Sequence, residues 1–253
     1  MPRLRWGCVG AHELQTVVLR KGYSMIKEPP LLTIRRNFTR PPRELIKKLE
    51  GAQTGHIADA QMGRAALDHR IKPVDPACSQ FVGTALTCQP GADDNLAILV
   101  ALALAKPGDV IVAAADAFSS TAVVGDNVSM MARNKGVVAI VIDGMARDTY
   151  GIVPAGLPVF SRGITPNSCV KSGPGRVGLP IVCGGVAIAP GDVVLGDRDG
   201  VVVIPQLQLE AVIGQLDDIR RLEEETQAKI RAGLTHPPSI DDLLKSDRVQ
   251  FLD

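Results

Sequence analysis

Residues 121–142 read Thr-Ala-Val-Val-Gly-Asp-Asn-Val-Ser-Met-Met-Ala-Arg-Asn-Lys-Gly-Val-Val-Ala-Ile-Val-Ile, and this stretch decides the fold class. Thr121–Val124 predicts a short strand, and a helix is expected from about Asp126 to Lys135. Gly136 ends this helix, and the apolar run Val137–Ile142 is typical of a buried strand. A strand, a helix and another strand in this order predict a parallel pair with a right-handed crossover, and therefore an α/β fold.

Gly, Pro and Asp residues divide the rest of the chain into similar short elements. Before this unit we expect helices at residues 41–51 and Ile57–Gln61, a strand at Phe81–Thr87, a helix at Asp93–Ala105 and a strand at Val110–Ala114. After it we expect strands at Pro158–Phe160, Ile181–Val182, Val186–Ile188, Val193–Leu195 and Val201–Ile204. The phrase Pro-Gly-Asp-Val occurs at residues 107–110 and 190–193, where it indicates turn chemistry rather than an internal repeat.

The composition is that of a globular protein with one sizeable core. The chain has 253 residues, of which 45% are hydrophobic and only 3% aromatic, so the core must consist mainly of Val, Ala, Ile and Leu. A net charge of +1 gives no electrostatic reason to expect nucleic acid or an anionic membrane as a partner. No apolar run reaches membrane-spanning length and the start is not a secretory signal, so we expect a cytoplasmic protein.

The cysteines and histidines argue against disulfides and against a zinc site. The cysteines form no CxxC pair, and their odd count indicates reduced intracellular thiols at Cys8, Cys78, Cys88, Cys169 and Cys183. The four histidines lie far apart, with none four residues from another, so we expect no zinc site built on histidine.

The chain divides into three regions: an N-terminal extension at 1–40, partly flexible, a single domain at 41–205, and a C-terminal helix and tail at 206–253. Residues 1–24 are basic and precede Met25, which fits either a weak targeting segment or extra residues before the true start. We favour a poorly ordered extension. The amphipathic helix from Leu207 to about Arg231 is of a kind that often packs on a partner subunit.

Chemically useful residues flank the strand–helix–strand unit. Asp126 starts the helix, and Arg147 and Asp148 follow the strand that ends at Ile142, so the topology predicts that they share one edge of the sheet. The free backbone N–H groups of Asp126, Asn127 and Val128 can hold a carboxylate at the helix start. Arg147 can hold the same small keto acid, and Asp148 is a hard oxygen ligand suited to Mg²⁺ or Mn²⁺.

A purely structural interpretation stands beside this one. Asp126 can be only a helix cap, and Arg147 and Asp148 can form an ordinary surface ion pair. On spacing alone the structural interpretation is the more common outcome.

The run from about Gly83 to Pro205 resembles the RraA-like family, which includes the 4-hydroxy-4-methyl-2-oxoglutarate aldolases. The matching phrases are Gly91-Ala-Asp-Asp-Asn-Leu96, Ala105-Lys-Pro-Gly-Asp-Val-Ile-Val112, Gly136-Val-Val-Ala-Ile-Val-Ile-Asp-Gly144, Arg147-Asp148, Pro158-Val-Phe160, Gly184-Gly-Val186 and Pro190-Gly-Asp-Val-Val-Leu-Gly-Asp-Arg-Asp-Gly-Val-Val-Val-Ile-Pro205. Aldolase members carry an acidic residue, twenty intervening residues and then Arg-Asp, and Asp126, residues 127–146 and Arg147-Asp148 reproduce this pattern.

The resemblance implies roles for these residues. Asp148 would anchor the divalent metal, and Arg147 would contact the pyruvoyl group and its enolate. Asp126 would orient a metal-linked water in proton transfer, and the amides after Gly125 would receive the substrate carboxylate. The implied fold is a layered β/β/α swivelling domain, similar to phosphohistidine domains, in a homotrimer or a homohexamer built as a dimer of trimers.

The implied activity is that of a class II, metal-dependent lyase. It would cleave 4-hydroxy-2-oxo-dicarboxylates to pyruvate by retro-aldol chemistry and decarboxylate oxaloacetate, both through a metal-stabilised enolate. Two alternatives stay open: a non-catalytic regulator that binds a ribonuclease or another protein, and an enzyme acting on a sugar-derived acid. The second arises because Ala117–Ser120 stands near the expected pocket where the family often has a Gly-rich turn.

Other motifs are assigned structural roles. Gly173-Pro-Gly175-Arg-Val-Gly178 matches GxGxxG but lacks the preceding strand and following helix of a dinucleotide fold. Asp197 and Asp199 predict a hairpin turn rather than a metal pair. Asp143 is expected to shape its loop, with contact to a metal-bound water as a further option. Cys169 and Cys183 have no nearby histidine in the sequence, which disfavours a thiol nucleophile.

Overall fold

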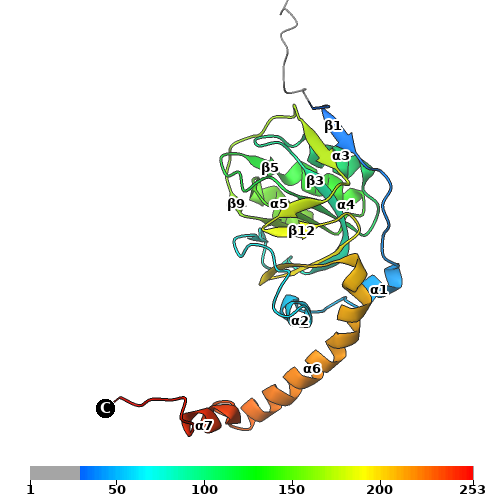
Figure 1. Ribbon diagram of the computed structural model, residues 1–253. Helices are drawn as coiled ribbons and strands as arrows, with labels where there is room; N and C mark the ends of the chain where they lie inside the picture. Colours follow the sequence, from blue (N-terminus) through cyan, green and yellow to red (C-terminus); the bar gives the residue numbers. More distant parts are fainter. Residues whose placement is uncertain (1–28, 253) are drawn as a thin grey trace, which may run out of the picture.

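The computed structural model describes residues 29–252, so the alternatives for residues 1–24 fall outside the described part (Figure 1). Four parallel strands form the centre of the domain: β3 (Phe81–Gln89), β4 (Asp109–Ala113), β6 (Ala139–Ile142) and β8 (Val159–Ser161). The helices between them are α3 (Leu96–Leu104), α4 (Asp126–Asn134) and α5 (Thr149–Ala155). The predicted α/β class is confirmed.

Antiparallel and edge strands widen this sheet. The strand order is β1-β10-β3-β4-β6-β8-β2, and the hairpin of β13 and β14 attaches to the first half of β3. The added strands are β1 (Leu32–Ile34), β2 (Lys72–Pro73), β10 (Gly175–Val177), β13 (Val193–Asp197) and β14 (Gly200–Ile204). A separate hairpin consists of β11 (Ile181–Cys183) and β12 (Val186–Ile188). Because β1 pairs with β10, part of the predicted extension belongs to the sheet.

The predicted pairing of the strand at residues 121–124 with the strand at 137–142 is wrong. β5 (Ala122–Val124) instead pairs in parallel with β7 (Met145–Ala146), and β7 pairs with β9 (Gly163–Ile164) in a second, three-stranded sheet. Both sides of β6 are already taken by β4 and β8. The prediction failed because consecutive strands were assumed to be neighbours.

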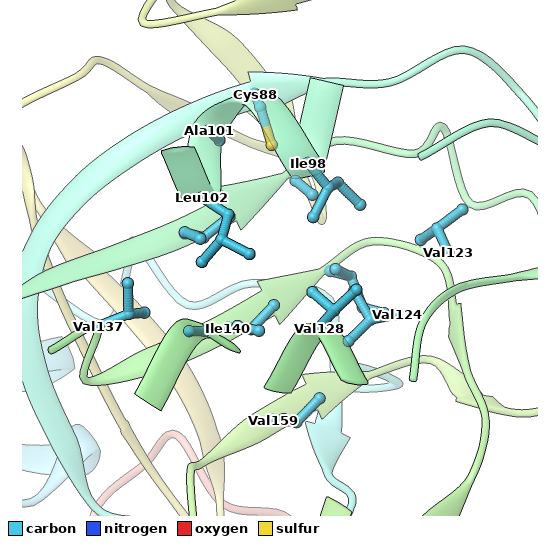
Figure 2. Packing of buried hydrophobic residues seen from close by; sticks show 14 of the residues in the cluster. Cys88, Ile98, Ala101, Leu102, Val123, Val124, Val128, Val137, Ile140 and Val159 are labelled. Atoms are coloured by element: carbon cyan, nitrogen blue, oxygen red, sulfur yellow. The ribbon is translucent and has the colours of Figure 1, made fainter. Parts of the chain in front are cut away.

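The central strands are buried on both faces, which explains their unbroken apolar runs. In β4, Ile111 and Ala113 pack against the helices, whereas Val110 and Val112 face the layer of β11 to β14. Figure 2 shows the helical side, where Ile98 of α3 belongs to the same cluster as β6 and α4. Each fully buried Val or Ile contributes about 1.5–3 kcal/mol through removal of apolar surface from water.

A third apolar cluster joins the hairpin to helices at the other end of the domain. It unites α1 (Arg43–Lys47), α2 (Thr54–Ala60), β13, β14 and the start of α6 (Leu209–Arg231), which follows a 3₁₀ turn at Gln206–Gln208. Leu209, Val212 and Leu216 are buried, while the second half of α6 and α7 (Pro238–Leu244) extend away from the body in Figure 1. Within residues 29–252, no helix combines the length and apolar character needed to cross a bilayer.

The two Pro-Gly-Asp-Val phrases are turns, as predicted. Lys106 N–H donates to Asp109 Oδ2 at 2.9 Å, and Ala189 N–H donates to Asp192 Oδ2 at 2.8 Å. Each carboxylate therefore closes its own turn, three residues back, before the strand begins. Asp109 also takes two hydrogen bonds from Arg40, at 2.9 and 2.8 Å, which fix the segment before α1 to the sheet.

Local backbone chemistry explains two other differences from the expected elements. The helix predicted from Asp93 begins only at Leu96, because Asp93 has a φ of +59° and Asp94 accepts the Leu96 amide at 2.7 Å. The helix α5 was not predicted, since Gly151 and Pro154 within it are usual helix breakers.

Ala117 lies in the left-handed region, with a φ of +55°, directly after Asp116 at +52°. This geometry favours glycine and costs an alanine about 1–2 kcal/mol. We expect Ala117→Gly to raise the free energy of unfolding by about 0.5–1 kcal/mol, because relief of the left-handed strain exceeds the loss from the greater freedom of glycine in the unfolded chain. Urea unfolding measures this. Ala211→Gly in α6 is the control and should destabilise by about 1 kcal/mol; a loss at position 117 would contradict the prediction.

Two buried thiols make stability depend on alkaline pH. Burial raises the pKa of Cys88 and of Cys183 well above the usual range. The unfolded chain releases these protons from about pH 8.5, whereas the folded chain keeps them. Their contribution is therefore complete below about pH 8.5 and falls above it by up to about 1.4 kcal/mol per pH unit for each thiol. Urea titrations from pH 7 to 10 should show this slope, and an equal slope in Cys88→Ala/Cys183→Ala would refute the assignment.

Candidate active site

The small sheet brings the predicted site residues together. β5 and β7 are parallel, with Ala122 opposite Met145 and Val124 opposite Ala146, so their carboxyl ends coincide. Arg147 N–H then donates to the carbonyl of Val124 at 3.0 Å. The expectation of a shared edge holds, but the edge belongs to the three-stranded sheet and not to the central one.

A cavity of about 160 Å³ opens at this edge. All predicted site residues line it: Gly125, Asp126, Asn127, Val128, Arg147 and Asp148. The remaining lining residues are Asn95, Leu99, Ala122, Val123, Val124, Met131, Ser168, Cys169 and Lys171. Both carboxylates and two cationic side chains therefore border one small space. Ala117–Ser120 is not part of this lining.

Arg147 and Asp148 form an ion pair at the rim, with Arg147 Nε 3.1 Å from Asp148 Oδ2. Their side chains are 36% and 42% exposed, so solvent screens the attraction and it contributes little to stability. Arg147 Nη1 also donates to Ser168 Oγ. Both side chains are thus oriented by neighbours yet open to a ligand.

Asp148 has an unusual backbone for a residue with a side chain. Its φ of +59° and ψ of +46° are left-handed, a region that Asp tolerates better than most residues. It occupies the N-cap position of α5 but makes no capping hydrogen bond with its side chain. The carboxylate lies instead close to Gly125, where a Cβ would stand 2.6 Å from Asp148 Oδ2. A side chain at position 125 would therefore have to displace the Asp148 carboxylate from this place.

The start of α4 differs in one detail from the expectation. Asn127 N–H donates to Asp126 Oδ1 at 2.6 Å, so this amide is already engaged. The amides of Asp126 and Val128 have no acceptor among the described residues. Gly125 has no side chain to cap the helix, which leaves these two donors for a ligand anion. Asp126 itself packs on Gly151, where a Cβ would lie 2.5 Å from Asp126 Cβ.

The donor set fits a hard divalent cation bound mainly through water and substrate. Among residues 29–252 no three His, Cys, Asp or Glu side chains gather into a metal site. Mg²⁺, however, commonly binds through one or two carboxylates and keeps several waters. Asp148, half exposed at the cavity, can provide such an oxygen, and Asp126 lies on the same cavity.

Sequence reasoning missed Asn95, Ser168 and Lys171. Asn95 is 8% exposed; its Nδ2 donates to Val123 O at 3.3 Å, and its buried Oδ1 has no hydrogen-bond partner. A buried acceptor without a partner costs about 1–3 kcal/mol, so a donor group on a ligand would relieve it. Asn95 ends the Asp-Asp-Asn phrase quoted above, which was a usable signal. Lys171 lies just before the GxGxxG match at Gly173–Gly178, which was assigned a structural role.

The remaining assignments have clear outcomes. Asp143 shapes its loop through Arg162 and the Gly184 amide but does not line the cavity. The GxGxxG match runs into β10 rather than a helix. Asp197–Gly200 forms the predicted hairpin turn, where Asp197 accepts from Thr54 N and Oγ1 at 2.8 Å each.

Cys169 lines the cavity, but its thiol is not activated. Burial, together with the nearby carboxylates of Asp93 and Asp94, raises its pKa. The thiolate, which is the nucleophilic form, is therefore disfavoured near neutral pH.

The contact between Gly125 and Asp148 gives a direct test of the site geometry. We expect Gly125→Ala to turn the half-exposed Asp148 carboxylate away from the start of α4, at a cost of at most about 1 kcal/mol in the free energy of unfolding, because the far end of this side chain can move. Gly214→Ala is the matched control: nothing lies within 4 Å of a Cβ there, and α6 should gain up to about 1 kcal/mol. Urea unfolding of both variants compares them, and equal stabilities would contradict the packing described here.

Known proteins resemble this chain along most of its length. It is 40% identical over 189 residues to a Halalkalibacterium halodurans protein named "Putative 4-hydroxy-4-methyl-2-oxoglutarate aldolase", covering 75% of this chain and 88% of that protein. It is 28% identical to the structure of Streptomyces coelicolor RraAS2, an unusual member of the RNase ES inhibitor RraA family, with a TM-score of 0.67 over 75% of this chain and all of that one.

The RNA-processing inhibitor RraA from Thermus thermophilis is 28% identical, with a TM-score of 0.56 over 61% of this chain and 93% of that one. These likenesses confirm the expected RraA-like fold. The family model described as RraA-like, Aldolase/RraA, matches residues 54–203, which is more than half of the chain. Together with the fold and the order of its site residues, this match shows that the chain belongs to the RraA-like family.

Proposed function

We propose that this protein is a divalent-metal-dependent carbon–carbon lyase. It would catalyse two reactions. It would cleave 4-hydroxy-2-oxo-dicarboxylates to pyruvate by retro-aldol chemistry, and it would decarboxylate oxaloacetate. The observation that supports this most is the convergence of Arg147, Asp148 and the free amides of α4 on one cavity. The aldolase name of the Halalkalibacterium halodurans relative points to the same chemistry.

The size and lining of the cavity suit a small dicarboxylic acid. Drug-sized ligands occupy about 300–1,000 Å³, whereas this cavity holds about 160 Å³. The carboxylate beside the keto group would accept hydrogen bonds from the amides of Asp126 and Val128. Arg147 would hold the keto oxygen, and Lys171 supplies a second cation for the distal carboxylate of a dicarboxylate.

Asp148 would hold the cation, Mg²⁺ or Mn²⁺. When bound, the ion supplies positive charge beside the keto oxygen, where negative charge grows as the bond breaks. The guanidinium of Arg147 adds a second, permanent positive charge at the same place.

Asp126 would orient the water that takes part in proton transfer. Its Oδ1 is occupied by the Asn127 amide, so Oδ2 is the oxygen available to orient a water. In retro-aldol cleavage the 4-hydroxyl loses its proton to this water while the C3–C4 bond breaks and its electrons move toward the keto oxygen. Decarboxylation of oxaloacetate moves the electrons of the lost carboxylate bond in the same direction, so one site can serve both reactions.

A second candidate function is that of a regulator that binds a ribonuclease or another protein. The structural likeness to two RraA proteins described as inhibitors favours it. The two functions differ in their need for Asp148, since only the lyase requires that carboxylate.

The proposal includes assembly as a homotrimer or homohexamer. Leu222 and Ile230 are exposed on the second half of α6, which extends away from the body (Figure 1), and would be available to a second copy of the chain. Sedimentation of the purified protein would decide its oligomeric state.

Pyruvate release from oxaloacetate tests the lyase. With Mg²⁺ or Mn²⁺ the wild-type protein should exceed the rate of the metal alone, and EDTA should abolish the difference. Asp148→Asn removes the charge but still tolerates the left-handed backbone, and we expect it to lower kcat by about 100-fold or more. Asp199→Asn, in the exposed hairpin turn, is the control. Full activity in Asp148→Asn, or none in folded wild-type protein with any divalent metal, would refute the lyase.

A further inference from the structure

A closed circuit of polar contacts lies at the amino ends of β7 and β9, whereas the cavity lies at the carboxyl ends of β5 and β7. Arg162 Nε donates to Asp143 Oδ1, and Arg162 Nη1 donates to Asp68 Oδ2 at 3.0 Å. Asp68 N–H donates to Gly184 O at 2.8 Å, and Gly184 N–H donates to Asp143 Oδ2 at 2.9 Å. The first and the last of these contacts both involve Asp143, so the circuit closes and joins four segments that are distant in the sequence.

The circuit is buried and balanced in charge. The side chains of Arg162, Asp143 and Asp68 are 11%, 9% and 17% exposed. Arg70, whose side chain is 64% exposed, also contacts Asp68 from the surface, with Nη2 2.6 Å from Asp68 Oδ2, so Arg162 and Asp143 are the charged groups withdrawn from water. Charges this far from water persist only when paired and hydrogen-bonded, and removal of one partner leaves the other unpaired. The arrangement therefore has one low-energy geometry.

The backbone at Gly184 is fitted to the circuit. Its φ is +55°, and a Cβ there would lie 2.8 Å from Ile71 Cδ1 and 3.0 Å from the Asp68 amide. Glycine at this position allows the carbonyl to accept from the Asp68 amide while the N–H donates to Asp143 Oδ2.

The circuit holds the two strands that lead to the site. Asp143 lies just before β7 and Arg162 just before β9, and Arg162 N–H also donates to Gly144 O at 2.8 Å. β7 and β9 have only two residues each, too few for their own pairing to fix their register. At its other end, β7 runs directly into Arg147 and Asp148.

We propose that the Asp143–Arg162–Asp68–Gly184 circuit positions the active site, with Arg162 as the central positioning residue. It sets the register of β7 against β9 and β5, and through β7 it places Arg147 and Asp148 over Gly125. The activity part of this proposal rests on the proposed lyase function. The structural part does not, because it concerns the hydrogen bond from Arg147 N–H to Val124 O.

The chain offers a matched control. Arg40 and Asp109 form another buried Arg–Asp pair, with two hydrogen bonds of 2.9 and 2.8 Å and side chains 22% and 1% exposed. This pair joins the segment before α1 to the start of β4, away from the cavity lining. If Arg162 only stabilised the fold, replacing either pair would have the same effect on the Arg147 amide and on activity.

The experiment compares Arg162→Lys, Asp143→Asn and the milder Asp68→Asn with Arg40→Lys and Asp109→Asn. Hydrogen exchange of the Arg147 amide is the first readout, normalised to global stability. We expect exchange at least tenfold faster in the three circuit variants and unchanged in the two controls. The second readout is pyruvate release, where Arg162→Lys should lower kcat by about 100-fold with a smaller change in KM, as misplaced groups do.

The two readouts separate the two proposals. Wild-type Arg147 protection in the folded circuit variants, or equal loss in the controls, would overturn the positioning role. If Arg162→Lys or Asp143→Asn fails to fold at 20 °C while both controls fold, the exchange measurement uses Asp68→Asn. In that variant Arg162 still has its ion pair with Asp143, so the fold should survive. Altered exchange without any wild-type turnover would support positioning and count only against the lyase.

Discussion

The hydrogen bond from the amide of Arg147 to the carbonyl of Val124 joins the two chain segments on which the site depends. It joins the last residue of β5 to the first residue after β7. Because β5 leads into α4 and β7 leads into Asp148, this single contact brings a helix N-terminus against a carboxylate. Gly125 leaves room for the Asp148 carboxylate in this place, since a Cβ there would stand 2.6 Å from Asp148 Oδ2.

Much of the fold was predictable from the sequence, for a physical reason. Runs such as Val110–Ala114 and Val137–Ile142 are apolar at every position, and only strands buried on both faces require that. Turn residues between them mark the ends of elements. The sequence does not show in the same way which strands pair with each other. Strands of two or three residues, such as β5 and β7, carry no pattern that selects a partner, so the pairing of β5 was assigned to the wrong strand.

The site was predictable where its chemistry is local. Asp126 precedes a helix and Arg147-Asp148 follows a strand, and both relations are visible along the chain. Asn95 and Lys171 were not found, because loops of the central sheet bring them to the cavity and loop positions depend on long-range packing. The buried circuit around Arg162 was beyond reach for the same reason. Its residues are spread from 68 to 184, and none of them shows a distinctive spacing.

The residues proposed for the chemistry are separate from those that hold the fold together. The three apolar clusters contain none of Asp126, Arg147 and Asp148. Arg147 and Asp148 are exposed enough that their ion pair adds little to stability, and Asp148 even holds a backbone conformation that costs free energy. Replacing these residues would therefore leave the fold intact while removing the chemistry. The scaffold is therefore compatible with either proposed function, a lyase or a protein-binding regulator, and the two proposals differ in their need for the Asp148 carboxylate.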